Sequence, residues 1–221
     1  MSSTPFQPPV DWETVYAANP RAYVFGDEPS QIARAALHFF SLFGGDPAAA
    51  HALDLGCGEG RDTAYYAAAG LRVTARDIAP SGLAKLGSLL ERDHTPVGRV
   101  DAALGDVREF AYPPDTYDIA LAANVFQFLT PDEGPAHIHR LKQCTKAGGV
   151  CAVGVFSPAM LEWGALVGDR YLATAADLAA FFPRDDGWLL LDRTEYWTYR
   201  LQEDTMASFA YVVARRTPPP L

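Results

Sequence analysis

The chain is 221 residues long with 49% hydrophobic and 20% charged residues, which favours one globular domain over residues 1–221 and excludes a disordered or fibrous protein. Because the net charge is −9, the protein repels phosphate backbones and anionic lipid headgroups, and we expect neither a nucleic-acid partner nor a membrane surface. Three cysteines without a CxxC pair, and a start without a secretion signal, lead us to expect a cytoplasmic protein.

The first 45 residues and the last five divide into tails and candidate helices. Residues 1–10 and 217–221 are rich in proline and carry no periodic pattern, so we predict that both are disordered tails. Residues 11–45 are interpreted as N-terminal lid helices, with the clearest helical pattern at Gln31–Phe43.

From about residue 50, short apolar or β-branched runs alternate with helical patterns, which is typical of βαβ units and a parallel sheet. The predicted strands are His51–Leu55, Arg72–Asp77, Val100–Gly105, Tyr117–Ala123, Val150–Phe156, Leu189–Tyr199 and Met206–Arg215. One predicted helix begins after Gly60. The others cover Pro80–Arg92, Pro131–Lys146 and Ala173–Phe182. The last two strands are too close in sequence for a helical crossover and should pair antiparallel. The fold class is therefore α/β, a Rossmann-like three-layer sandwich whose seven-stranded mixed sheet is mostly parallel and ends in a C-terminal antiparallel hairpin.

Glycines at 56, 58 and 60 form a loop between the first strand of this sheet and the next helix. Open α/β sheets bind ligands at such turns, and glycines let a ligand approach the backbone without a Cβ in the way. Arg61 occupies the position at which a dinucleotide fingerprint has its third glycine, which disfavours a pyrophosphate ligand and a nicotinamide-dependent oxidoreductase.

Polar groups follow the ends of the neighbouring strands. Asp77 lies 21 residues after Gly56, where a carboxylate can accept hydrogen bonds from both hydroxyls of a ribose. Asp106 and Val107 are candidates for the amine and the ring of an adenine, although Asp106 also fits the cap of a short turn. Asp54, Asn124 and the carbonyl groups near Ala122 could face an ammonium group. A ligand with a ribose, an amine and a positive charge fits this edge better than one with phosphates.

The run DLGCGEGRD (54–62), followed by DIAPSGLAK (77–85), resembles the class I S-adenosylmethionine-dependent methyltransferases. Together with YVFGDEPS (23–30), it looks most like the tellurite-resistance and thiopurine-type branch. The resemblance implies S-adenosylmethionine as cofactor and S-adenosylhomocysteine as product. The cofactor-binding residues that we expect are Asp54, Gly56, Cys57, Gly58, Gly60, Arg61, Asp77, Ile78, Asp106, Val107, Ala122 and Asn124.

Two features depart from the family pattern. Arg76 replaces the apolar residue that the family usually has before the acidic residue, and the C-terminal strand lacks the histidines of the tellurite branch. The second departure makes tellurite a poor choice as substrate.

Catalytic and metal-binding residues are harder to assign. Glu195, Tyr196 and His137 are weak candidates for a general base, none supported by spacing, so the catalytic residue stays unassigned. His137 and His139 face different sides of a helix, cannot share a metal, and are expected on the surface, and we expect no metal site. For Cys57, packing beside the ligand is a simpler interpretation than nucleophilic catalysis.

Four aromatic residues of the N-terminal region, Trp12, Tyr16, Tyr23 and Phe25, form either a small core cluster or a lid over the acceptor, and we assign them to substrate binding. We expect Trp12–Ser30 and Ser157–Phe182 to determine the choice of acceptor. The expected function is in-line methyl transfer to a small molecule by a monomer or homodimer. The alternatives are a protein that binds S-adenosylmethionine without transfer, or a nicotinamide-dependent oxidoreductase.

Overall fold

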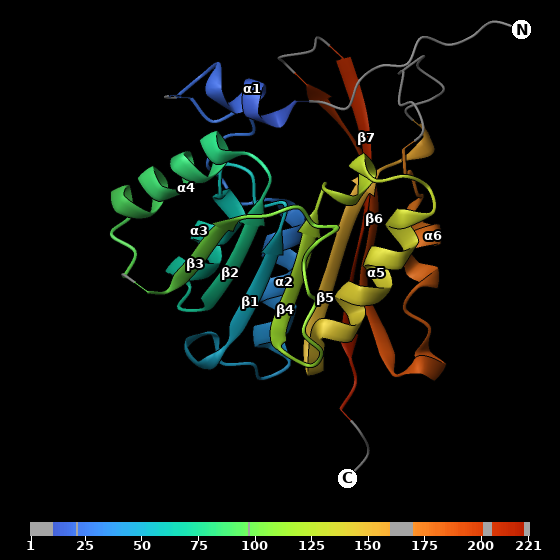
Figure 1. The fold of residues 1–221 in the computed structure, drawn as a ribbon. Coiled ribbons are helices and arrows are strands. Elements are labelled where there is room, and N and C mark those ends of the chain that lie inside the picture. The colour runs from blue at the N-terminus through green and yellow to red at the C-terminus, as the bar shows by residue number, and fades with distance from the viewer. Residues whose placement is uncertain (1–10, 21, 97, 160–169, 201–204, 219–221) are drawn as a thin grey trace, which may run out of the picture.

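The structure of the chain is a computed structural model that describes residues 11–20, 22–96, 98–159, 170–200 and 205–218 (Figure 1). Its strands are β1 His51–Leu55, β2 Arg72–Asp77, β3 Val100–Leu104, β4 Tyr117–Ala123, β5 Thr145–Phe156, β6 Trp188–Arg200 and β7 Thr205–Arg216. Its helices are α1 Trp12–Ala17, α2 Gln31–Leu42, α3 Arg61–Ala68, α4 Pro80–Arg92, α5 Glu133–Cys144 and α6 Ala175–Ala180. Short 3₁₀ turns include η1 Pro47–Ala49, η2 Phe126–Phe128 and η4 Arg184–Asp186.

The strands form one sheet in the order β3-β2-β1-β4-β5-β7-β6. β3, β2, β1, β4 and β5 are parallel, while β7 is antiparallel to both β5 and β6. This arrangement confirms the predicted fold class. The strand order reverses between β1 and β4, and the crevice at such a switch point is where open α/β sheets bind ligands.

Helices cover both faces of the sheet because successive side chains of a strand point to opposite faces. Ala52 belongs to a core cluster with residues of α2 and α3, whereas Leu53 and Leu55 belong to the cluster on the other face, which includes residues of α5 and α6. α4 adds Leu86 against Cys57 and Ala75, beside α3. The three layers hold the carboxyl ends of the parallel strands at one edge, the upper edge in Figure 1, where α1 also lies.

The expectation of lid helices over residues 11–45 does not apply to α2. Ile32, Ala36 and Phe40 are buried on this amphipathic helix and belong to the same core cluster as β4, β5 and β7. α2 is therefore a layer of the sandwich. α1 is begun by Asp11, whose side chain accepts the amide N–H of Thr14, and it packs against α4 above the sheet.

The predicted helix Pro131–Lys146 extends too far at both ends. α5 ends at Cys144, and Thr145 already pairs with Tyr117 of β4. The residues before Gly148 form a strand because they pair with β4, and the local sequence does not encode this pairing. Thr217, expected in the disordered C-terminal tail, donates its amide and hydroxyl to the carbonyl of Gly187. The other predicted tail residues, apart from Pro218, lie outside the described residues. Among the described residues, every helix is too short or too polar to cross a lipid bilayer.

Candidate cofactor site

The glycine loop between β1 and α3 has a left-handed backbone conformation that residues with a Cβ rarely adopt. Gly56, Gly58 and Gly60 have φ angles of +69°, +53° and +88°. A Cβ at Gly56 would lie 2.5 Å from the side chain of Val125, and one at Gly60 would lie 2.3 Å from that of Leu86. Glycine is therefore required here both by the backbone conformation and by space.

Asp77, at the end of β2, organises this loop. Its carboxylate accepts the amide N–H of Gly58 at 2.7 Å and that of Ala79 at 2.9 Å. The side chain is buried, and this burial raises the pKa of Asp77. Each carboxylate oxygen keeps a further lone pair, so the group can still accept hydroxyl donors such as those of a ribose. Arg76 points elsewhere, since its guanidinium pairs with Asp101 of β3 at 2.8 Å.

Asp54, at the end of β1, lies beneath the loop and accepts the hydroxyl of Thr63 at 2.6 Å. Burial, and then the nearby Asp62, raise its pKa well above that of an ordinary carboxyl. Cys57 is buried against Ala75, and burial also raises the pKa of its thiol. A thiol held protonated is a poor nucleophile, which supports the packing interpretation of Cys57.

The residues expected around an adenine lie at the ends of β2 and β3. Ile78 is 60% exposed and Leu104 is 61% exposed, which is unusual for large apolar side chains. Asp106 caps a turn, accepting the amide N–H of Arg108 at 2.8 Å and pairing with its guanidinium at 3.0 Å. Val107 is buried, and its carbonyl accepts the hydroxyl of Tyr112. The turn is thus fixed beside an exposed apolar edge on which a flat ring could lie.

Ala122 and Asn124 occupy the end of β4 next to the glycine loop. Ala122 is fully buried inside the strand. Asn124 has a left-handed backbone, with φ +59°, and donates its amide N–H to Gly154 at 2.9 Å. This turn directs Val125 against Gly56, so β1 and β4 meet closely at the switch point.

Three charged residues of the loop bind the N-terminal segment, a role that the sequence analysis missed. Glu59 accepts the amide of Val24 at 2.7 Å and pairs with the buried Lys85 at 2.6 Å. Asp62 accepts the amide and the hydroxyl of Ser30 at 2.6 and 2.7 Å. Arg61, expected at the cofactor, donates to the carbonyl of Phe25 at 2.9 Å. The motif GEGRD therefore holds residues 24–30 beside the loop.

α1 lies directly over this loop. Glu13 accepts the amide and hydroxyl of Ser81, at the start of α4, at 2.8 and 2.6 Å. The hydroxyl of Tyr16 lies 2.7 Å from where a Cβ on Gly58 would be. Trp12 stacks on Tyr16 with ring centres 5.4 Å apart and also contacts Phe25 at 5.9 Å. Tyr23 instead donates to the carbonyl of Lys85 on α4.

A wall of rings continues from α1 toward β7. The ring of Trp12 meets Phe128 edge-on at 5.3 Å, Phe128 is 6.3 Å from Phe156, and Phe156 is 5.0 Å from Phe209. Tyr196 stacks on Phe209. This wall stands above the carboxyl ends of β4 and β5, beside the glycine loop. Met160 and Trp163, aromatic or apolar residues of the stretch 157–182, lie outside the described residues.

Two of the candidate bases are engaged elsewhere. Glu195 accepts the hydroxyl of Ser157 and the amide of Ala175. His137 is 5% exposed, so the expectation of a surface residue was wrong, whereas His139 is exposed. A hydrogen bond of 2.9 Å joins the ring of His137 to the hydroxyl of Tyr112, a partner 25 residues away in sequence.

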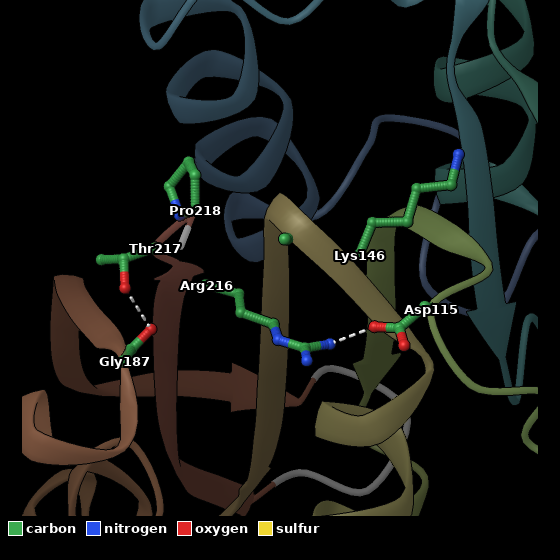
Figure 2. A pocket seen from close by; sticks show the side chains of 7 residues that line it. Asp115, Lys146, Gly187, Arg216, Thr217 and Pro218 are labelled. Carbon is green, nitrogen blue, oxygen red and sulfur yellow. Dashed lines mark hydrogen bonds and ion pairs between the residues drawn. The ribbon is translucent and has the colours of Figure 1, made fainter. Parts of the chain in front are cut away.

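The opposite edge of the sheet has a hollow of a different kind. Figure 2 shows that it is lined by Asp115, Lys146, Ala147, Gly187, Arg216, Thr217 and Pro218. Arg216 pairs with Asp115, and Lys146 pairs with Asp118 at 2.8 Å. The charged side chains at this hollow are therefore paired with each other. Among the described residues, no three His, Cys, Asp or Glu side chains come together as a metal site would need.

Known proteins resemble this chain in sequence and in fold. Residues 52–149 match the family model described as a methyltransferase domain. The probable S-adenosyl-L-methionine-dependent methyltransferase TehB of Haemophilus influenzae is 33% identical over 97 residues, which cover 44% of this chain and 32% of TehB. The chain therefore spans about a third of the length of this curated relative.

Two solved structures illustrate the likeness in fold. The 1,6-didemethyltoxoflavin-N1-methyltransferase of Burkholderia thailandensis, solved with S-adenosylhomocysteine, has a TM-score of 0.65 at 22% identity, covering 98% of this chain and 93% of that chain. The [4+2]-cyclase SpnF has a TM-score of 0.56 at 16% identity, covering 82% and 81%. At these identities the likeness shows the fold alone, which a methyltransferase and a cyclase share.

The sequence match covers the glycine loop, Asp77, the turn at Asp106 and the first four strands, which are the parts that meet at the switch point of the sheet. Residues 52–149 are thus similar to a methyltransferase domain, and the same part of the chain resembles the probable S-adenosyl-L-methionine-dependent methyltransferase TehB.

Proposed function

We propose that this protein binds S-adenosylmethionine and transfers its methyl group to a small-molecule acceptor by in-line displacement. The observation that carries the proposal is the loop of three left-handed glycines at the switch point, tied by the Gly58 amide to the carboxylate of Asp77. A ligand that meets this loop comes within reach of a carboxylate suited to a ribose and of the exposed Ile78.

Each part of the cofactor has residues that suit it. Gly56, Cys57, Gly58 and Gly60 would line the methionine part, with Asp54, Arg61, Ala122 and Asn124 around its charged end. Asp77 would accept the ribose hydroxyls, while Ile78, Asp106 and Val107 would adjoin the adenine. When bound, S-adenosylmethionine supplies a methyl group on a sulfonium and leaves as a neutral thioether.

The chain's own contribution is orientation and exclusion of water. Tyr16 lies over the glycine loop, and Trp12 packs against both Tyr16 and Phe25, so these rings would exclude water from a ligand bound there. Phe128 continues this wall toward the acceptor. Because Glu195 and His137 are engaged in hydrogen bonds within the fold, an acceptor that ionises without a general base suits the site best.

The setting follows from charge. With a net charge of −9 and acidic groups at the carboxyl edge of the sheet, we infer that the protein acts on a small molecule and not on nucleic acid. Its three cysteines are free and buried, which supports a reducing compartment such as the cytoplasm. We infer further that it acts as a monomer or homodimer.

Melting temperatures of the pure protein with S-adenosylmethionine, S-adenosylhomocysteine and NADH test the cofactor assignment. We expect stabilisation by the first two and none by NADH. Release of S-adenosylhomocysteine in the presence of mixed small-molecule acceptors then tests transfer. Stabilisation by NADH alone would point to an oxidoreductase, and binding without release across the acceptors would point to a protein that only binds the cofactor.

A further inference from the structure

We propose that Arg170 binds an anionic group of the acceptor, so that the acceptor is a small aromatic molecule that carries a carboxylate. This inference rests on the proposed function and names its substrate class. Arg170 is half-buried, and its guanidinium carbon lies 5.4 Å from the centre of the Phe128 ring.

Other arginines near the site have hydrogen-bonding or ionic partners among the described residues. Arg61 donates to Phe25, Arg76 pairs with Asp101, and Arg108 pairs with Asp106. Within the described part of the chain, Arg170 forms neither an ion pair nor a hydrogen bond. Burial lowers the pKa of Arg170. A desolvated cation without an anion is costly, and a ligand that supplies the anion would offset this cost.

The position of Arg170 is set by the backbone that follows it. The amide of Tyr171 donates to Leu129 at 2.9 Å, and that of Ala173 donates to Phe156 at 3.2 Å. These bonds hold residue 170 beside η2, above the carboxyl ends of β4 and β5. Arg170 therefore lies on the acceptor side, next to the ring wall.

The contacts along the wall separate Arg170 from the cofactor residues. Tyr16 touches the glycine loop, Trp12 stacks on Tyr16, and Phe128 meets Trp12. The guanidinium of Arg170 contacts Phe128, the last ring of this series. The distribution of charge agrees with this division, because the buried carboxylates Asp54 and Asp77 lie at the cofactor end, where a cationic ligand fits.

The rings beside the guanidinium favour an aromatic acid over an inorganic anion. A guanidinium is planar and binds a carboxylate through two parallel hydrogen bonds. The neighbouring rings of Phe128 and Trp12, which are only partly buried, offer flat apolar surface, which an aromatic body fills and an inorganic oxyanion does not. A protein of net charge −9 also repels anions in general, so an anionic acceptor requires a dedicated cation.

Calorimetric titrations of the protein saturated with S-adenosylhomocysteine test the proposal. The probes are benzoate, 2-naphthoate and indole-3-carboxylate, each compared with its primary amide, with inorganic sulfate as an anion without a ring. The variants are Arg170→Gln, Arg170→Lys and the control Arg184→Gln, which makes the same charge change at an exposed position on η4. Circular dichroism checks that each variant is folded.

We expect at least one acid to bind about tenfold more tightly than its amide, as one charge-assisted pair supplies. Arg170→Gln should abolish this preference, Arg170→Lys should keep part of it, and Arg184→Gln should keep all of it. The affinity for S-adenosylhomocysteine should change less than twofold in every variant, which a guanidinium bound to the cofactor's own carboxylate would not allow.

Four results would overturn the proposal: no acid binds, amides bind as well as acids, sulfate competes as well as the aromatic acids, or Arg170→Gln retains the preference. A loss of S-adenosylhomocysteine affinity in Arg170→Gln would also overturn it, because the guanidinium would then serve the cofactor. If the unmodified protein fails to bind S-adenosylhomocysteine, the proposed function itself fails, and this outcome is distinct from all of these.

Discussion

Among the described residues, Asp54 and Asp77, at the carboxyl ends of the parallel strands, lack the cationic partners that Asp115 and Asp118 have at the amino ends, although Glu59 and Asp106 at the carboxyl edge are paired with Lys85 and Arg108. At the amino ends of the strands, Asp115 pairs with Arg216 and Asp118 pairs with Lys146. At the carboxyl ends, Asp54 and Asp77 are buried and accept hydrogen bonds only from neutral donors among the described residues. Buried carboxylates without a cation lower the stability of the fold. We therefore interpret Asp54 and Asp77 as carboxylates that bind a ligand, whereas the ion pairs at the amino ends stabilise the fold.

Matched valine substitutions at two glycines should separate these edges most strongly. Gly58→Val places a branched side chain at φ +53° against the hydroxyl of Tyr16, where we propose that the cofactor meets the backbone. We expect affinity for S-adenosylhomocysteine to fall by about 100-fold or more, which is roughly 2.7 kcal/mol. Gly148→Val, with φ +84° and nothing closer than 3.8 Å to its Cβ, imposes similar backbone strain at the amino edge and should leave this affinity unchanged. Calorimetry on both variants decides, and equal losses would mean that strain alone acts.

Deletion of residues 1–25 removes the cover over the carboxyl edge and leaves the amino edge intact. Cofactor affinity should stay within a few-fold, while methyl transfer to an identified acceptor falls by about two orders of magnitude because water exclusion and orientation are lost. The deletion also removes the groups that contact Glu59 and Lys85, so Trp12→Ala is the milder companion variant. Normal turnover by both folded variants would show that the aromatic cluster is only core.

Asp77→Ala should weaken binding of S-adenosylmethionine by about 1.5 to 3 kcal/mol, since hydrogen bonds to a charged acceptor are lost. Part of this loss would come from the Gly58 amide, which Asp77 also binds. The control Asp115→Ala breaks an exposed ion pair at the amino edge and should change binding little. Unchanged calorimetric affinity in a folded Asp77→Ala variant would remove the ribose assignment.

The smallest effect concerns stability without a ligand. Since burial raises the pKa of Asp54 in the folded state, the folded protein holds this proton more tightly, and stability falls as the pH rises above the unfolded pKa. Asp62, Asp77 and Arg61 act on the same carboxyl. Asp54→Asn should therefore stabilise the protein at pH 8 by about 1 kcal/mol, or roughly 2–4 °C.

The pH dependence of the stability gained by Asp54→Asn tests this prediction. Thermal unfolding at pH 8 and pH 5 should give a smaller gain at pH 5, where protonated Asp54 no longer opposes folding. Burial lowers the pKa of His51 to about 4 and also lowers that of His137, but both act equally in the two proteins and cancel in the difference. A gain that is independent of pH would mean that Asp54 does not titrate in this range.

Elements whose ends depend on local sequence were predicted correctly, whereas those that depend on contacts with distant residues were not. β1, β2, β4 and α4 have the predicted bounds because their ends are set by local signals, namely the glycine turns around β1 and β2, the left-handed Asn124 after β4, and Pro80. The predicted helix through Lys146 failed because pairing of Thr145 with Tyr117 is a long-range interaction.

The site shows the same division. Local spacing was enough to bring Gly56, Gly58 and Asp77 together at one edge. The partners Glu59 and Lys85 were missed because they are 26 residues apart and meet only when α4 packs beside the loop. The burial of His137 was missed for a similar reason, since it depends on Tyr112.

A crystal structure of the complex with S-adenosylhomocysteine tests the central claim most directly. The account predicts the ribose hydroxyls on Asp77, the adenine beside Ile78 and Val107, and the thioether sulfur between the glycine loop and the rings of Trp12 and Phe128. A nucleoside bound in the hollow of Figure 2, or a ribose turned away from Asp77, would contradict it.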